Sequence, residues 1–324
     1  MTSNMSSSGS DATTAAHIQA FLLSIISIGG SLGNGIVLVA MSRTAKLRNC
    51  TNIFIGSLAV SDMINCLTLP WNIVAVLSVD HWPLPSAICL MSSLVLITCT
   101  IASVYSLASV AYVRYIVVTK PSGKIDKFVN SKITMILITS TWLMSLATAL
   151  SPIVFEIVEL GFDSKYHICL WDTNSPGHIV FSCIFAMVLI PVPLFSMTYY
   201  YLAIFLFIRK EAEKINTQRS TLHLTTPPCQ LQNGVSISNV RKRNIDVTKN
   251  LFIVVLAFVI CSIPHSLAII IPGTAAIIPY TAIIFNCSGC INPLIYARKF
   301  PEYRRVISKM FGFKVNTVHD ISCS

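Results

Sequence analysis

The chain has 324 residues, of which 54% are apolar and only 11% are charged. This composition is too rich in apolar residues for an ordinary soluble domain and favours a membrane protein. An enzyme is disfavoured, because the sequence contains no GxxxxGKS nucleotide loop and no His and Cys cluster at metal-binding spacing. The net charge of +10 would suit a nucleic-acid partner, but the positions of the charges predict a membrane topology and no nucleic acid.

Seven stretches are apolar over the length of about 20 residues that a membrane-spanning helix needs. They are Ala20–Met41, Ile53–Leu77, Ala87–Val118, Ile133–Phe155, Ile179–Ile208, Leu251–Ile271 and Ala275–Ala297. We therefore predict an all-α membrane protein, a seven-transmembrane helix bundle over residues 20–297, after an extracellular tail at 1–19. A polar stretch at about 212–243 reads as a flexible cytoplasmic loop, and 298–324 as an amphipathic helix and a tail.

The positive charges fix the predicted orientation. With the N-terminus outside, all but one of the 23 Lys and Arg residues lie on the cytoplasmic side, and the exception is Lys165. We expect a multi-pass protein of the plasma membrane with a cytoplasmic C-terminus. Asn4, in the sequon "NMS", then lies outside and is a candidate for glycosylation.

Two of the eleven cysteines face the oxidising side in this topology. Cys89 begins the third span and Cys169 lies in the loop after the fourth. Because disulfides form on the oxidising side, we predict that these two pair and tie the loop to the third span.

The stretch after the last span has the spacing of an amphipathic helix. Its apolar face carries Phe300, Tyr303 and Ile307, with the basic residues Arg304, Arg305 and Lys309 around that face. We expect it to lie on the lipid of the inner leaflet. An ordered but irregular tail is the alternative.

Asp62 is the one clear acid within the seven apolar cores. A charge in the membrane is costly, so it needs polar neighbours. The candidates are Asn34, Ser103, Ser288 and Asn292. We expect a buried network that accepts a sodium ion; the alternative is a network that only joins helices.

Several short motifs occur in order along the seven spans. They are "GNGIVLV" with Asn34, "SLAVSD" with Asp62, Cys89, Arg114 with Tyr115, Trp142, Pro193, Tyr201, "CSIP" with Pro264, and "NPLIY" with Asn292, Pro293 and Tyr296. With these motifs the chain resembles rhodopsin-like (class A) G-protein-coupled receptors over all seven spans. The stretches "TNIFIGSLAVSD" and "EYRRVI" are also similar to melatonin-type receptors.

The resemblance implies a switch. An extracellular agonist lets the sixth span swing at Pro264, where a proline removes a helix hydrogen bond, and a cleft opens for a heterotrimeric G protein. Tyr201 and Tyr296 then meet Arg114 at the cytoplasmic side. By the same likeness Val104, Pro193 and Phe258 form a connector below the ligand pocket; ordinary helix packing is the alternative for Val104 and Phe258.

The chain departs from the family pattern at three positions. Val113 replaces the usual acid before Arg114, Asn244 replaces an acid of the sixth span, and Ser262 replaces the tryptophan before Pro264. We therefore predict raised basal signalling, with Asp246 as an alternative partner for Arg114. The rival interpretation is a signalling-impaired receptor-like protein that scavenges a ligand or dimerises with another receptor.

The resemblance also limits the ligand. Leu96 occupies the position of the amine-binding aspartate of aminergic receptors, and Asn286 that of the lysine to which opsins attach retinal. An amide cannot form that Schiff base, so no covalent retinal is expected. Candidate pocket residues are Trp71, Leu96, Thr100, His178, His265, Tyr280 and Asn286. Helix-to-helix hydrogen bonding is the alternative role for the histidines, and a small, weakly charged or lipid-like ligand fits best, with a short peptide left open.

Overall fold

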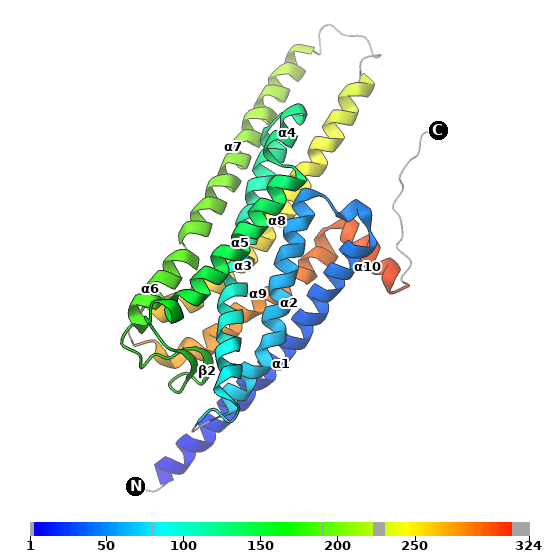
Figure 1. Cartoon of the computed structure of the whole chain (residues 1–324). Helices are drawn as coiled ribbons and strands as arrows, with labels where there is room; N and C mark the ends of the chain where they lie inside the picture. Colours follow the sequence, from blue (N-terminus) through cyan, green and yellow to red (C-terminus); the bar gives the residue numbers. More distant parts are fainter. Residues whose placement is uncertain (1–2, 79–80, 190, 223–230, 272, 313–324) are drawn as a thin grey trace.

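The structure is a computed structural model that describes residues 3–78, 81–189, 191–222, 231–271 and 273–312. Long helices lie side by side in an elongated bundle, and a two-stranded hairpin covers one end of it (Figure 1). Within the described residues, seven helical segments are long and apolar enough to cross a membrane. The predicted seven-span, all-α architecture is confirmed.

Six spans are single helices: α1 (Ser3–Arg43), α2 (Cys50–Leu77), α3 (Ser86–Thr119), α5 (Ser131–Val154), α8 (Leu231–Ile270) and α9 (Ile278–Lys299). The remaining span consists of α6 (His178–Leu189) and α7 (Pro191–Leu222). Shorter helices are η1 (Ala45–Leu47), α4 (Ser122–Phe128), η3 (Ala275–Ile277) and α10 (Pro301–Met310). The strands β1 (Leu160–Asp163) and β2 (Ile168–Trp171) were not anticipated from the sequence.

Helical structure extends beyond the predicted boundaries at two places. α1 begins at Ser3, so the region 1–19 expected as a tail is helical from that residue onward. α7 continues to Leu222 and α8 starts at Leu231, which narrows the loop expected at about 212–243. Alanine, glutamate, lysine and glutamine are good helix formers and are frequent in the stretch "KEAEKINTQ" that extends α7, whereas the first residues of α1 are mostly serine, threonine and glycine.

Asparagine caps and prolines explain where several helices start. The side chain of Asn49 accepts a hydrogen bond from Asn52 N at the start of α2, and that of Asn130 accepts one from Ile133 N at the start of α5. These bonds satisfy backbone donors that have no partner within the helix. Pro191 opens α7, where the absence of a backbone N–H is tolerated.

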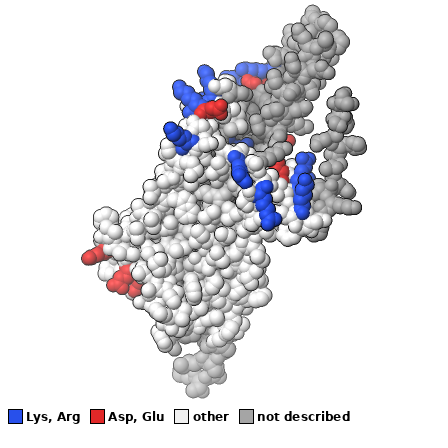
Figure 2. Space-filling model, turned by 45° about the vertical axis from the view of Figure 1, so that its right-hand side comes forward, with Lys and Arg blue, Asp and Glu red and all other residues white. Residues whose placement is uncertain are grey.

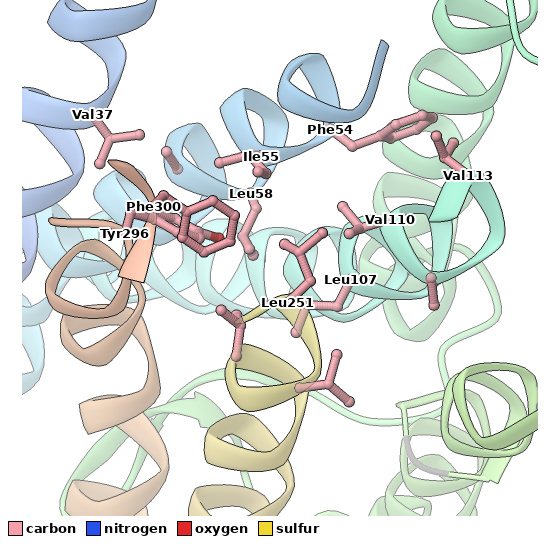
Figure 3. Close-up of a cluster of buried hydrophobic side chains, with 14 of the residues drawn as sticks. Val37, Phe54, Ile55, Leu58, Leu107, Val110, Val113, Leu251, Tyr296 and Phe300 are labelled. Carbon is pink, nitrogen blue, oxygen red and sulfur yellow. The ribbon is translucent and has the colours of Figure 1, made fainter. Parts of the chain in front are cut away.

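α3 is the central helix of the bundle and packs against α2, α5, α7, α8 and both strands. The largest apolar cluster joins α1, α2, α3, α8 and α9, with Val37, Phe54, Leu107, Leu251 and Tyr296 among its members (Figure 3). Burial of such side chains stabilises contacts between helices even inside a membrane, where close packing is the main attraction.

A close approach of three helices occurs at Gly30. A Cβ atom on this residue would lie 2.2 Å from Cys66 Sγ and 3.1 Å from Cys290 Sγ. The absence of a side chain therefore lets α1 pack directly against α2 and α9, as small residues do in membrane bundles.

The two ends of the bundle differ in charge (Figure 2). One end, here called the basic end, carries Arg43, Lys120, Lys132 and Lys299 at the ends of α1, α3, α5 and α9, together with Arg209 within α7 and Lys249 within α8. The other, here called the hairpin end, carries β1 and β2, paired antiparallel with Leu160 opposite Trp171.

The hairpin is fastened to the bundle by several bonds. The predicted disulfide between Cys89 and Cys169 is present and joins β2 to the start of α3. Cys169 N donates to Asn72 Oδ1 at 3.0 Å, and His167 Nδ1 lies 2.8 Å from Ser78 O, both on or beside α2. The hairpin is thus held against α2 and α3 together.

α10 confirms the predicted helix after the last span. Tyr303 is buried and its ring stacks on Tyr296 of α9, with centroids 5.8 Å apart. Arg304, Arg305 and Lys309 are exposed on the other side. The helix is therefore amphipathic, with its buried face against the end of α9.

Candidate functional site

The centre of the bundle contains a buried carboxylate held by two neighbours. Ser103 Oγ of α3 donates to Asp62 Oδ1 at 2.7 Å, and Asn292 Nδ2 of α9 donates to Asp62 Oδ2 at 2.8 Å. No Lys or Arg of the described residues pairs with Asp62. The carboxylate thus links three helices through hydrogen bonds alone, as the sequence predicted for Ser103 and Asn292.

Two other residues predicted for the Asp62 network make no hydrogen bond to the carboxylate within the described part of the chain. Asn34 Nδ2 donates to the backbone oxygens of Gly30 and Gly289, each at 2.9 Å, so Asn34 joins α1 to α9 without contacting the carboxylate. Ser288 makes no hydrogen bond to Asp62 within the described part of the chain.

A line of hydroxyl groups that the sequence reading missed continues from this carboxylate. Ser61 Oγ lies 2.8 Å from Ser103 Oγ, and Ser57 Oγ lies 3.2 Å from Ser106 Oγ. Trp142 Nε1 of α5 donates to Ser57 Oγ at 3.1 Å. The spacing of these serines in the sequence could have predicted this line, because serines three or four residues apart in α2 and in α3 share one face of each helix.

Arg114 lies at the basic end of α3 and is buried, with 8% of its surface exposed. Among the described residues no carboxylate forms an ion pair with it, and its Nε atom has no hydrogen-bond partner. Asp246, the alternative partner, is exposed and makes no such pair. The side chain of Asn244 lies outside the described residues, as does that of Asn4.

Arg114 lies near several polar groups, while its neighbour Val113 packs among apolar side chains. Val113 is buried in the apolar cluster near Phe54 (Figure 3). Tyr201 of α7 and Glu302 of α10 are close enough to interact electrostatically with the guanidinium. The hydroxyls of Tyr201 and Tyr296 are buried and have no partner among the described residues. Unpaired polar groups therefore gather at this point of the bundle, where each is costly.

Tyr115 points away from that group. Its ring packs against Tyr200 and Tyr199 of α7, with centroids 5.6 Å and 6.4 Å apart. Tyr112 packs against Tyr200 at 5.6 Å. The next residue after Arg114 thus holds α3 to α7 through aromatic contacts.

The region of the predicted hinge lies between α3, α7 and α8. Pro264 is inside α8, and Ser262 Oγ donates to Phe258 O at 2.7 Å within the same helix. Val104, Pro193 and Phe258 line a common cavity. The predicted connector residues therefore lie around one space between the three helices. Pro293 is a separate case, since it lies inside α9 and packs beside Gly33 of α1.

The residues predicted to line the ligand pocket differ in how deeply they are buried. His265 Nδ1 lies 3.1 Å from Thr281 Oγ1, and its ring packs on Phe285 at 5.5 Å. Thr100 is buried, and its hydroxyl accepts a hydrogen bond from Asn65 Nδ2 at 3.5 Å. Asn65 was not among the predicted pocket residues. Leu96 and Asn286 are half-buried. These side chains come from α2, α3, α8 and α9 and face the interior.

Three predicted residues are placed differently. Trp71, 40% exposed, lines a hollow of about 360 Å³ between α2 and α3 with Met91 and Val95. Tyr280 is 47% exposed. His178 Nδ1 lies 2.8 Å from Ser175 O at the start of α6. The rotation of a helix about its own axis decides such exposure, and a motif does not report it.

Covalent retinal does not fit these residues. Asn286 Nδ2 donates to Ala282 O at 2.8 Å, and an amide nitrogen is not nucleophilic. The lysine of α9 is Lys299, the last residue of the helix at the basic end.

Comparison with known proteins shows to which family the chain is similar. The family described as "7 transmembrane receptor (rhodopsin family)" matches residues 33–296. The chain is 29% identical to Melanopsin-B of Gadus morhua, over 91% of this chain and 48% of that protein. It is 26% identical to Green-sensitive opsin P521 of Gekko gecko, over 93% of this chain and 79% of that protein.

The chain spans about half the length of the melanopsins that it matches. Squid rhodopsin has the same fold, with a TM-score of 0.77 at 18% identity, over 93% of this chain and 86% of that one. The seven helices, the buried Asp62 network and the match over residues 33–296 agree. The chain belongs to the rhodopsin family of seven-transmembrane receptors.

Proposed function

We propose that the protein is a G-protein-coupled receptor of the plasma membrane. The basic end faces the cytoplasm, because cytoplasmic loops carry an excess of Lys and Arg. The hairpin end faces outside and receives a small, weakly charged or lipid-like ligand. A heterotrimeric G protein binds at the basic end, and the amphipathic α10 lies on the inner leaflet.

The observation that carries this proposal is the position of Arg114. It is buried beside the unpaired hydroxyl of Tyr201; no carboxylate of the described residues forms an ion pair with it, and Glu302 of α10 acts on it only electrostatically. Such a group gains from any partner that brings acceptors or lets it reach water. Outward movement of α8 would expose it to a G protein.

G-protein dissociation sensors in co-expressing cells test this proposal. Wild type is expected to release G protein, without ligand or during a ligand screen, and Arg114→Gln is expected to abolish the release. Arg43→Gln is the matched control, because Arg43 is exposed at the basic end of α1, away from α7 and α8. No release from wild type across the G-protein classes would instead support a ligand scavenger or a dimer partner.

We propose further that the Asp62 network binds a sodium ion. The carboxylate is buried without a cationic partner among the described residues, and the hydroxyl oxygens of Ser61 and Ser103 are adjacent. Hard cations prefer such oxygen ligands. Thermal unfolding is expected at higher temperature in sodium chloride than in choline chloride of equal ionic strength, and Asp62→Asn is expected to remove the difference.

Orientation and modification have a separate test. An N-terminal epitope is expected to be accessible on intact cells, and Asn4→Gln is expected to remove a glycosidase-sensitive mass shift. An epitope that is reached only after permeabilisation would contradict the orientation.

A further inference from the structure

A cavity of about 190 Å³ lies between α3, α7 and α8. Val104 of α3 and Met197 of α7 form its inner wall, and both are buried at 1% exposure. Phe258 and Ser262 of α8 line it as well. A tryptophan, which the family pattern places at position 262, would occupy part of this space, so the cavity is linked to this chain's own serine.

The side chains that line the cavity favour an apolar occupant. Eight of the ten lining residues are apolar, and the other two are Ser262 and Ser266. Both hydroxyls already donate to backbone oxygens of α8, to Phe258 O at 2.7 Å and to Ser262 O at 2.9 Å. A ligand with hydrogen-bond acceptors would therefore lose its hydration without finding a free donor in this wall.

The cavity opens on the outer face of the bundle, which the membrane covers. Ile263 and Leu267, which also line it, are exposed. α7 packs mainly on α3 and α8 mainly on α9, so the seam between α7 and α8 is thinly packed. An occupant can thus enter sideways from the lipid.

We infer that this cavity between α7 and α8 binds a ring-sized apolar molecule dissolved in the membrane. The size agrees, because an apolar protein cavity of about 150 Å³ is known to bind benzene. Its occupant would touch Val104 and Phe258 and lie alongside the turn of Pro264, because the α8 residues that line the cavity flank this proline on both sides. The inference concerns binding and does not depend on the proposed coupling to a G protein.

Photolabelling in lipid nanodiscs tests the inference. The probe is 3-trifluoromethyl-3-phenyldiazirine, an apolar arene that partitions into bilayers, and labelled residues are located by mass spectrometry. Phe195 of α7, 74% exposed, reports contact with bulk lipid, whereas Met197 is unreachable from the lipid except through the cavity. Labelling of both residues is expected in wild type.

Two measurements separate the cavity from bulk lipid. Excess toluene is expected to suppress labelling of Met197 and to leave that of Phe195 unchanged. Ser262→Trp is expected to abolish labelling of Met197 alone. The matched control is Ile260→Trp, which adds the same ring on an exposed position of α8 that does not line the cavity.

The inference is wrong if Met197 is unlabelled in wild type, or if neither toluene nor Ser262→Trp lowers its labelling. The toluene competition needs no variant, so it decides the question even where Ser262→Trp does not fold. A protein that never releases G protein but shows the expected labelling would contradict the proposed function and leave the cavity site standing.

Discussion

Asn292 of α9 donates a 2.8 Å hydrogen bond to the carboxylate of Asp62 in α2, across 230 residues of sequence. Ser103 of α3 donates to the other carboxylate oxygen. One buried acid therefore holds three helices, and losing either donor leaves its charge less well satisfied.

Asn292→Ala is expected to lower the free energy of unfolding by about 1.5 to 3 kcal/mol, because it removes a hydrogen bond to a buried charged group. Thermal unfolding in nanodiscs measures the change. Ser109→Ala is the control in α3: within the described part of the chain its hydroxyl bonds only to Tyr105 O of its own helix, and the effect of removing it is expected to be small. Equal losses in both variants would show that the bond to Asp62 contributes nothing special.

Val113→Asp is expected to lower ligand-free G-protein release. The new carboxylate is adjacent in sequence to Arg114, whose Nε has no partner among the described residues. An opposite charge close to a guanidinium favours the charged form of both groups and the arrangement that brings them together. Val113→Asn has the same size and no charge, so it separates pairing from the loss of apolar packing. Release normalised to surface expression is the measurement, and an undiminished signal in Val113→Asp would contradict the idea.

Tyr303→Phe is expected to leave stability unchanged or to raise it. The Tyr303 hydroxyl is buried without a partner among the described residues, and burial raises the pKa of this phenol. Removing an unsatisfied polar group costs nothing. Tyr303→Ala, in contrast, removes the ring that packs on Tyr296 and is expected to cost about 3 to 5 kcal/mol. A large loss in the phenylalanine variant would reveal a hydrogen bond that these contacts do not include.

Cys169→Ser is expected to destabilise the receptor by about 2 to 5 kcal/mol, the usual effect of losing a native disulfide. Cys89→Ser should match it, and the double variant should add nothing. Cys183→Ser is the control, since this thiol is free and exposed. Unequal losses in the two single variants would indicate a second role for one cysteine.

Incubation with retinal followed by borohydride is expected to fix no retinal to the protein. Asn286 offers an amide, and no lysine of the described α9 precedes Lys299. Mass spectrometry of the intact chain gives the answer, with a known opsin as the positive control. A covalent adduct on any lysine in the bundle would overturn this expectation.

The sequence predicted the features that carry a large energetic cost. A buried acid such as Asp62 needs donors, and Ser103 and Asn292, two of the four candidates named from the sequence, supply them. The pairing of Cys89 with Cys169 followed from topology, because it depends on which loops share one side of the membrane.

Features that depend on the exact rotation of a helix were not predictable in the same way. Trp71 and Tyr280 were expected to face the ligand pocket; they are 40% and 47% exposed, and Trp71 lines a hollow between α2 and α3. The Ser61 contact and the stacking of Tyr303 on Tyr296 depend on how closely neighbouring helices approach. Apolar periodicity in a membrane protein is weak evidence for facing, because lipid and core are equally apolar.

The fastening of the hairpin has a consequence for biosynthesis. Cys89 and Cys169 lie 80 residues apart, and most of α3 and all of α5 fall within that interval. In the proposed orientation the bond can close only after α5 has been inserted and the hairpin has crossed to the oxidising side. The disulfide therefore marks molecules whose first four spans are in place, and variants of Cys89 or Cys169 should reach the cell surface in smaller amounts, whether or not a ligand is present.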